Sequence, residues 1–286
     1  MRTVSLTSLL LAAILLFVYK AAADEGVPIP VKASLVPDVS AIVPGKSFKV
    51  GVLFEIIPHW HIYWKNSGDT GLPTKVVFRL PEGFSTGELQ WPVPQVYTRA
   101  GDISDYGYED SLLLYSQVNV PEELKTGSVI DIAAEVSWVS CEEICIPGKA
   151  ELELKLPVSG KQEQVNTDLF SRWENALPLF ESDKKNPFKV EISSTVKNET
   201  SETIHIALSH EKSVSGIELY PVPGDDLSVS DITIDNTNEV GKTDIKLEVR
   251  ALSGRNLKDS NLETLIVYKD ADGKRSGVSL SIPIGN

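Results

Sequence analysis

The chain has 286 residues, with 27 lysines and arginines against 40 aspartates and glutamates, which gives a formal net charge of −13. An acidic protein of this kind repels phosphate backbones, so nucleic acid is excluded as an expected partner. The length suits one large domain or two ordinary ones, and a core of that size needs no disulfide to hold it together.

The first 23 residues are typical of a secretory signal peptide. Arg2 gives a positive start, residues 9–18 form a short apolar run, and a series of small residues ends at Ala23. The apolar run is shorter than the roughly 20 residues that span a bilayer, so a membrane anchor is the less favoured alternative. We expect cleavage near Ala23 and a periplasmic or otherwise exported chain with no membrane span. Loss of Arg2 and Lys20 changes the net charge from −13 to −15.

Short segments of alternating hydrophobicity follow in the mature chain, which is typical of half-buried β-strands. Turn signals rich in proline and glycine separate them, and this spacing predicts an all-β sandwich over residues 24–158. Residues 98–110 are polar and contain two glycines, so we expect a long functional loop there. The segments that alternate are residues 31–35, 48–56, 59–64, 76–80, 112–120, 130–138 and 150–156.

The pattern changes at residues 159–186, which we expect to be a linker. Leu169, Phe170, Trp173, Ala176 and Leu177 have helical spacing, which predicts one short helix. Alternation then returns over residues 187–286, which predicts a second, smaller β-sandwich domain without cysteine.

Cys141 and Cys145 are the only cysteines and lie between two predicted strands that form a hairpin. The residues of even number in the first strand point inward, so odd-numbered Cys141 is expected on the outward face, with the pair near the surface. A disulfide between them closes a ring of five residues, which stabilises a fold by only on the order of 2 kcal/mol. A redox-active pair is therefore favoured over a structural disulfide or a metal site, although all three remain open.

Two acidic neighbours, Glu142 and Glu143, lie inside the ring, where no basic residue balances them. Carboxylates beside a thiol disfavour the thiolate and raise its pKa. We therefore expect a thiol pair that reacts when a partner docks, not a strong oxidant.

The metal alternative depends on His59 and His61, which would share one face of a strand and could bind copper or zinc together with a thiolate. Paired histidines on a strand are usually ordinary polar residues, and the single methionine, Met1, argues against a thioether copper site. We assign no metal ligand and no cofactor beyond the cysteine pair. The chain also lacks the common motifs of hydrolases and phosphate loops.

Four motifs in this order resemble the periplasmic N-terminal region of the thiol:disulfide interchange protein DsbD, in the branch that includes the copper-sensitivity suppressor ScsB. They read WHIYWKNSGDTGLP at residues 60–73, LQWPVP at 89–94, DYGYE at 105–109 and CEEICIPG at 141–148. The resemblance implies an immunoglobulin-like fold with the cysteines on a hairpin. It also implies a relay of reducing equivalents to oxidised periplasmic proteins by thiol–disulfide exchange.

The resemblance further assigns roles to individual residues. Cys145 would form the mixed disulfide with the partner, and Cys141 would resolve it. A cap loop would cover the pair until docking, and it corresponds to Asp105, Tyr106, Gly107 and Tyr108, with the two tyrosines as shielding aromatics.

The aromatic residues of the family beside the cysteines correspond to Tyr63 and His61. Best-known members have a longer gap between the cysteines and an aromatic residue where Asp105 stands. The chain ends at Asn286 without the transmembrane and thioredoxin-like modules that usually follow. We therefore expect a thioredoxin-like or membrane electron donor on a separate chain. The alternative function is a non-redox adaptor or copper-handling module with a structural disulfide.

Overall fold

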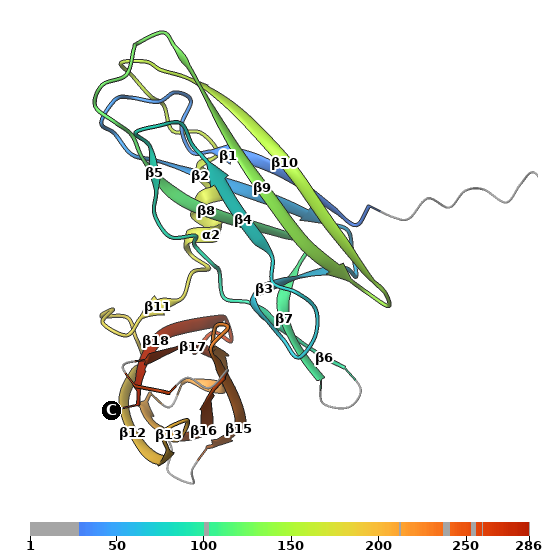
Figure 1. Ribbon diagram of the computed structural model, residues 1–286, viewed down its shortest axis with the longest axis vertical. Helices are drawn as coiled ribbons and strands as arrows, with labels where there is room; N and C mark the ends of the chain where they lie inside the picture. The colour runs from blue at the N-terminus through green and yellow to red at the C-terminus, as the bar shows by residue number, and fades with distance from the viewer. Residues whose placement is uncertain are drawn as a thin grey trace, which may run out of the picture.

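The computed structural model describes residues 29–99, 103–211, 213–236, 241–252, 256–258 and 260–285. The expected signal peptide over residues 1–23, with its cleavage position, lies outside the described residues. The regular structure of the described residues is strand apart from one short helix, which confirms the all-β prediction. Figure 1 shows a larger body built from β1 to β10 and a smaller body built from β12 to β18. None of the described helices is long and apolar enough to cross a membrane.

The first domain contains two antiparallel sheets. One has the strand order β1-β2-β8-β5, and the other has the order β10-β9-β3-β7-β6, with β4 also paired to β9. The strands are β1 (Val31–Pro37), β2 (Phe48–Ile56), β3 (His61–Gly68), β4 (Lys75–Arg79), β5 (Ser85–Thr86), β6 (Gln95–Arg99), β7 (Ile103–Glu109), β8 (Ser111–Asn119), β9 (Val129–Cys141) and β10 (Cys145–Pro157).

The two sheets face each other across an apolar core, as their alternating sequences predict. Phe54 of β2 and Ile62 of β3 are fully buried. The ring of Phe54 meets the indole of Trp138 edge-on, with 5.7 Å between centroids. Each such side chain contributes about 1.5–3 kcal/mol through burial, so the core fixes which face of every strand points inward.

The β9–β10 hairpin extends without a break to the two cysteines. Its pairing register runs from Val129 opposite Pro157 to Cys141 opposite Cys145. The alternation predicts strands only over residues 130–138 and 150–156, but Pro147 and Gly148 also lie within β10. Gly148 is opposite Trp138 in this register. A Cβ atom there would come within 2.3 Å of the indole, so only glycine fits against that ring.

The predicted linker divides between the two bodies. Its helix α2 (Thr167–Glu174) buries Phe170 and Trp173. Phe170 meets Tyr115 of β8 at 5.7 Å between ring centroids, which places the helix against the first domain. The following short strand, β11 (Leu179–Phe180), pairs with a strand of the second domain.

The second domain is also a sandwich of two sheets with its own apolar core. One sheet has the order β11-β18-β17-β14 and the other β12-β13-β16-β15. The strands are β12 (Phe188–Asn198), β13 (Ser201–His210), β14 (Ser215–Val222), β15 (Leu227–Asp235), β16 (Lys242–Ala251), β17 (Ser260–Lys269) and β18 (Arg275–Ile284).

The two domains meet through a small set of specific contacts. The ring of Tyr106 in β7 stacks on Tyr220 of β14, with centroids 4.1 Å apart. The side-chain amide of Asn66 donates a hydrogen bond to the Pro221 carbonyl at 2.5 Å. The second domain therefore packs on the same part of the large sheet that carries β3 and the β6–β7 hairpin.

Candidate functional site

The only two cysteines of the chain form a disulfide at the tip of the β9–β10 hairpin. Their Cα atoms are 4.2 Å apart, and the two residues are direct antiparallel partners. The hairpin turn therefore consists of the three residues between them. Ser140 donates a hydrogen bond from its hydroxyl to the Ile146 carbonyl at 3.0 Å, beside the disulfide.

The two cysteines differ sharply in their access to solvent. Cys145 is exposed, whereas Cys141 has no accessible surface. The expectation that both lie near the surface is wrong for Cys141. Its outward direction follows the strand alternation as expected, but other parts of the chain cover that outward face. An attacking group from solvent can therefore approach the disulfide at Cys145.

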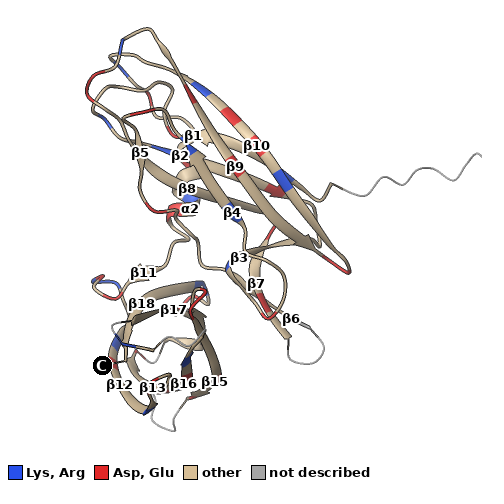
Figure 2. Cartoon of the chain, viewed as in Figure 1, with Lys and Arg blue, Asp and Glu red and all other residues tan. Residues whose placement is uncertain are grey.

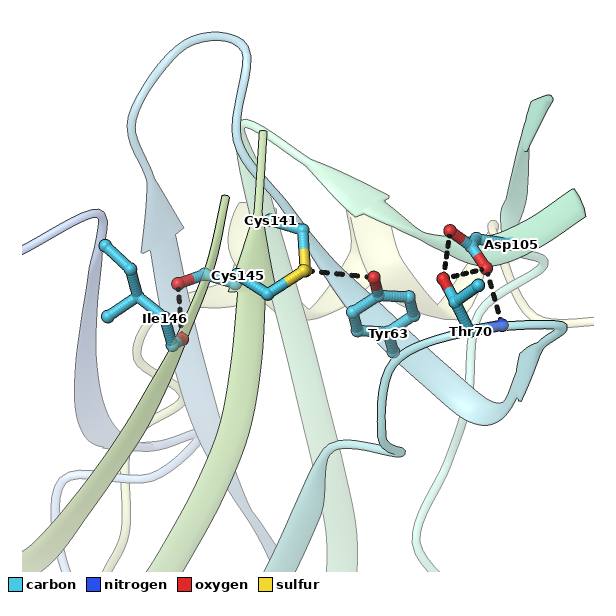
Figure 3. The surroundings of a disulfide bond; sticks show 7 residues. Tyr63, Thr70, Asp105, Cys141, Cys145 and Ile146 are labelled. Atoms are coloured by element: carbon cyan, nitrogen blue, oxygen red, sulfur yellow. Dashed lines mark hydrogen bonds between the residues drawn. A yellow bond between two sulfur atoms is a disulfide. The ribbon is translucent and has the colours of Figure 1, made fainter. Parts of the chain in front are cut away.

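Tyr63 of β3 covers Cys141. The tyrosine is fully buried, and its hydroxyl donates a hydrogen bond to the Cys141 Sγ atom over 3.0 Å (Figure 3). β3 lies beside β9, with His61 directly opposite Cys141 in the register. Because Tyr63 lies two residues after His61, its side chain emerges on the same face as the sulfur.

The loop after β3 holds Tyr63 in place. Gly71 adopts a φ of +73°, and a Cβ atom there would lie 2.2 Å from the tyrosine ring. The loop is tied to β7 by Asp105, which is fully buried. One carboxylate oxygen of Asp105 accepts hydrogen bonds from the Thr70 backbone N–H at 2.9 Å and from its hydroxyl at 2.7 Å (Figure 3).

His61 and Tyr97 continue the cover on the same face. His61 is buried, stacks on Tyr97 at 4.5 Å between centroids, and meets Tyr63 edge-on at 5.2 Å. Tyr97 lies in β6, and burial raises the pKa of its hydroxyl far above the ordinary value. Sequence reasoning missed Tyr97. The only indication for Tyr97 is its outward position on a strand paired with β7. That position can be inferred only once the β6–β7 hairpin is recognised.

The expected cap loop is a strand. Residues 98–110, predicted to be a loop, include the end of β6 and all of β7, so Asp105, Tyr106, Gly107 and Tyr108 lie in a hairpin. Residues 100–102 lie outside the described chain.

The two tyrosines predicted to shield the disulfide lie on the opposite face of the sheet. Tyr108 pairs with Ile62 and is buried in the core, where its hydroxyl donates to the Pro92 carbonyl at 2.7 Å. Tyr106 shares this inner face and stacks on Tyr220. Gly107 lies opposite Tyr63 instead, where an added Cβ would come 2.2 Å from the Ile62 carbonyl oxygen. In this arrangement Tyr106 and Tyr108 do not contact the cysteines.

The histidine pair considered for copper or zinc is not arranged on one strand face. His59 lies in the turn before β3 with a φ of +73° and is exposed, whereas His61 is buried within β3. Within the described residues, no group of three or more histidine, cysteine or acidic side chains could hold a metal ion.

Comparison with known families links this geometry to thiol–disulfide chemistry. Residues 31–157 match the family described as the N-terminal region of the thiol:disulfide interchange protein DsbD. Over this range the chain is similar to a DsbD-type N-terminal domain. The match covers the two sheets of the first domain and includes both cysteines.

A solved structure extends the likeness to the second domain. The N-terminal periplasmic domain of ScsB from Proteus mirabilis superposes with a TM-score of 0.61 at 15% sequence identity. The similarity covers 89% of this chain and 94% of the ScsB chain, so the two share an arrangement of two β-domains. No curated protein sequence matches the chain.

Proposed function

We propose that the protein carries out thiol–disulfide exchange through Cys141 and Cys145 and relays reducing equivalents to oxidised exported proteins. The observation that carries this proposal is the asymmetry of the disulfide, with Cys145 exposed and Cys141 buried under Tyr63. A purely structural bond needs neither one exposed cysteine nor a hydroxyl that donates to the sulfur of the other, because the large core already stabilises the fold.

Reduction of the disulfide begins when the thiolate of an electron donor attacks the Cys145 sulfur. A new bond joins the donor to Cys145, the bond between Cys145 and Cys141 breaks, and Cys141 leaves as a thiolate. The hydroxyl of Tyr63, 3.0 Å away, donates its hydrogen bond to that developing charge. A second thiol of the donor then attacks the donor's own bridging sulfur and releases Cys145 reduced.

Transfer to an oxidised protein reverses these roles. The Cys145 thiolate attacks one sulfur of the acceptor disulfide, and the other acceptor sulfur leaves as a thiolate. Cys141 then attacks the Cys145 sulfur, which restores the intramolecular disulfide and releases the reduced acceptor. Two electrons and two protons pass to the acceptor in each cycle.

The proposal includes an exported location and a redox partner on another chain. Disulfides persist in oxidising compartments outside the cytosol, and the structurally similar ScsB domain is described as periplasmic. A thioredoxin-like protein or a membrane protein would serve as the electron donor.

Reduction by a thioredoxin tests the proposal. The oxidised protein is incubated with a reduced thioredoxin, and its free thiols are counted by maleimide labelling and mass measurement. We expect two new thiols under native conditions and none in the Cys141→Ser/Cys145→Ser double variant. A disulfide that stays oxidised in the native protein but is reduced after unfolding would be structural and would contradict the proposal.

A further inference from the structure

The outer face of the sheet beside the disulfide is arranged in rows across neighbouring strands. The first row contains the two paired cysteines, and the next contains Val139 and Pro147. A row of Lys75, Ser137 and Lys149 follows, because Ser137 pairs with a lysine on each side. A last row is formed by Val77, Glu135 and Glu151. Successive rows lie two residues apart, or about 6.6 Å.

A groove of about 440 Å³ follows these rows away from the cysteines. Trp138 and Gly148 are among the residues that line it, although the Trp138 indole points to the inner face and packs against Phe54. Leu72 and Pro147 line the groove, and Leu72 is 64% exposed. Ile144 at the disulfide end is 61% exposed. The exposed residue Cys145 therefore lies at one end of an apolar surface that the described chain leaves uncovered.

The charges on this surface differ between its two ends. Glu142 and Glu143 are exposed in the hairpin turn at the disulfide end, and Lys75 and Lys149 are exposed on the third row. Figure 2 shows this acidic tip of the β9–β10 hairpin and a basic band farther along β10. Neither lysine forms an ion pair with another described residue.

Acidic side chains in the row beyond the lysines limit how far the basic part of this surface extends. Glu135 is paired with Arg79. Glu151 forms no ion pair with another described residue, so negative charge returns one row beyond the lysines. A ligand with an acidic group is therefore favoured only over the lysine row, about 13 Å from Cys145.

We propose that this groove binds an extended segment of the redox partner, with the partner's reactive cysteine over Cys145. An apolar residue two positions from that cysteine would contact Val139 and Pro147. An acidic residue four positions away would lie between Lys75 and Lys149. This inference rests on the proposed exchange function, and it adds the sequence pattern by which a partner is recognised.

Activated peptides provide the probe. Each heptapeptide contains one cysteine joined in a mixed disulfide to thionitrobenzoate. The Cys145 thiolate of the reduced protein attacks the peptide sulfur, and coloured thionitrobenzoate leaves, so absorbance gives the rate. Cys141 then attacks the Cys145 sulfur and releases the reduced peptide, while the protein becomes a disulfide. The protein supplies both electrons, and no other reductant is needed.

Two isomeric peptides with the same composition and net charge carry the decisive comparison. One has glutamate four residues from the cysteine and leucine two residues away, and the other has glutamate next to the cysteine. We expect the first to react about threefold to tenfold faster at low salt, since it meets the lysines and avoids Glu142 and Glu143. The difference should shrink in 0.5 M salt. Both chain directions are tested, because the groove can bind a strand either way.

Charge-changing variants of the protein test whether Lys75 and Lys149 cause the preference between the two peptides. Lys75→Glu and Lys149→Glu should each remove most of the preference. Lys46→Glu changes the charge equally at an exposed turn before β2 and should leave it intact. Lys75→Gln and Lys149→Gln repeat the test with a smaller perturbation, and circular dichroism confirms folding.

The outcomes separate the groove from the exchange function. Equal rates for the two isomers, or an equal loss in Lys46→Glu, would overturn the groove proposal while exchange itself continued. A reduced native protein that attacks neither peptide would instead overturn the proposed function. A second-order rate constant that falls as the protein concentration rises would show that a second copy of the chain occupies the groove. That result would also contradict binding of a partner segment.

Discussion

The two faces of the sheet formed by β3, β7 and β6 carry aromatic clusters with different roles. On the outer face, Tyr63, His61 and Tyr97 form one aromatic cluster, and the Tyr63 hydroxyl donates a hydrogen bond to the Cys141 sulfur. On the inner face, Tyr106 stacks on Tyr220 and links the two domains. A shift of one residue along a strand decides whether an aromatic side chain serves the disulfide or the domain contact.

Because the two faces make different contacts, substitutions on them should affect different properties of the protein. Changes on the inner face should lower stability without altering the sulfur chemistry. Changes on the outer face should alter access to Cys141 or the reactivity of the disulfide. Each of the following predictions tests that separation.

Tyr220→Ala should have the largest effect on stability. Tyr220 is 3% exposed and contacts both Tyr106 and Trp64 of the first domain. Truncation of a buried aromatic residue costs about 3–5 kcal/mol of unfolding free energy, which denaturant titration measures. The rate of reduction by a thioredoxin under native conditions should stay within about twofold of the wild-type rate. A large change in that rate would show that the faces are not independent.

Gly71→Ala should disturb the outer face. The new Cβ would meet the Tyr63 ring, and a positive φ is unfavourable for alanine, so we expect a loss of about 1–3 kcal/mol. In the reduced protein, Cys141 should become open to alkylation by iodoacetamide as Tyr63 moves. Gly127→Ala is the matched control, since its φ is also positive but its added Cβ has no neighbour within 4 Å. Cys141 equally protected in both variants would contradict this account.

Tyr63→Phe should slow reduction of the disulfide while preserving the fold. It removes the hydroxyl that donates to Cys141, and the loss of such a bond to a developing thiolate should slow the step about fivefold to tenfold. Tyr108→Phe removes the same atom from the inner face and should leave the rate unchanged. Stopped-flow reduction by a thioredoxin measures both. Equal rates in the two variants would remove Tyr63 from the proposed mechanism.

Tyr106→Phe should have the smallest effect, and only in alkali. Burial, aided by the charges of Asp69 and Glu218, raises the pKa of Tyr106 to about 12. In the unfolded chain its hydroxyl ionises near pH 10. The contribution of the neutral hydroxyl to stability is therefore complete below pH 10 and declines as the pH rises toward 12. Denaturation midpoints at pH 8 and pH 11 should fall less in Tyr106→Phe than in the wild type, and identical declines would contradict the assignment.

The strands of the first domain were predictable because alternation records which side of a strand is buried. The inward positions of β9, such as Ile132 and Trp138, are confirmed by their burial. The β6–β7 hairpin was missed because glycine and polar residues there resembled a loop. Gly107 is instead required by the close approach of the β3 backbone, and Asp105 is buried because it binds Thr70.

Other features of the site depend on contacts between distant parts of the chain. Alternation gave the correct direction of Cys141, but it could not show that the loop containing Gly71 covers that face. Tyr97 was missed for the same reason, since its contact with His61 joins segments that only the folded sheet brings together.

The identity of the attacked sulfur tests the central claim most directly. The Cys141→Ser protein cannot resolve a mixed disulfide, and the Cys145→Ser protein retains only the buried sulfur. Each is incubated with a thioredoxin-like protein whose second cysteine is replaced by serine and whose remaining cysteine is joined to thionitrobenzoate. Thionitrobenzoate leaves when a thiolate attacks, and the partner has no second thiol to break the mixed disulfide. The products are separated without reductant and mapped by mass spectrometry. We predict a stable mixed disulfide at Cys145 in Cys141→Ser and none in Cys145→Ser. Trapping at Cys141, or at neither cysteine, would contradict exchange through the exposed sulfur of Cys145.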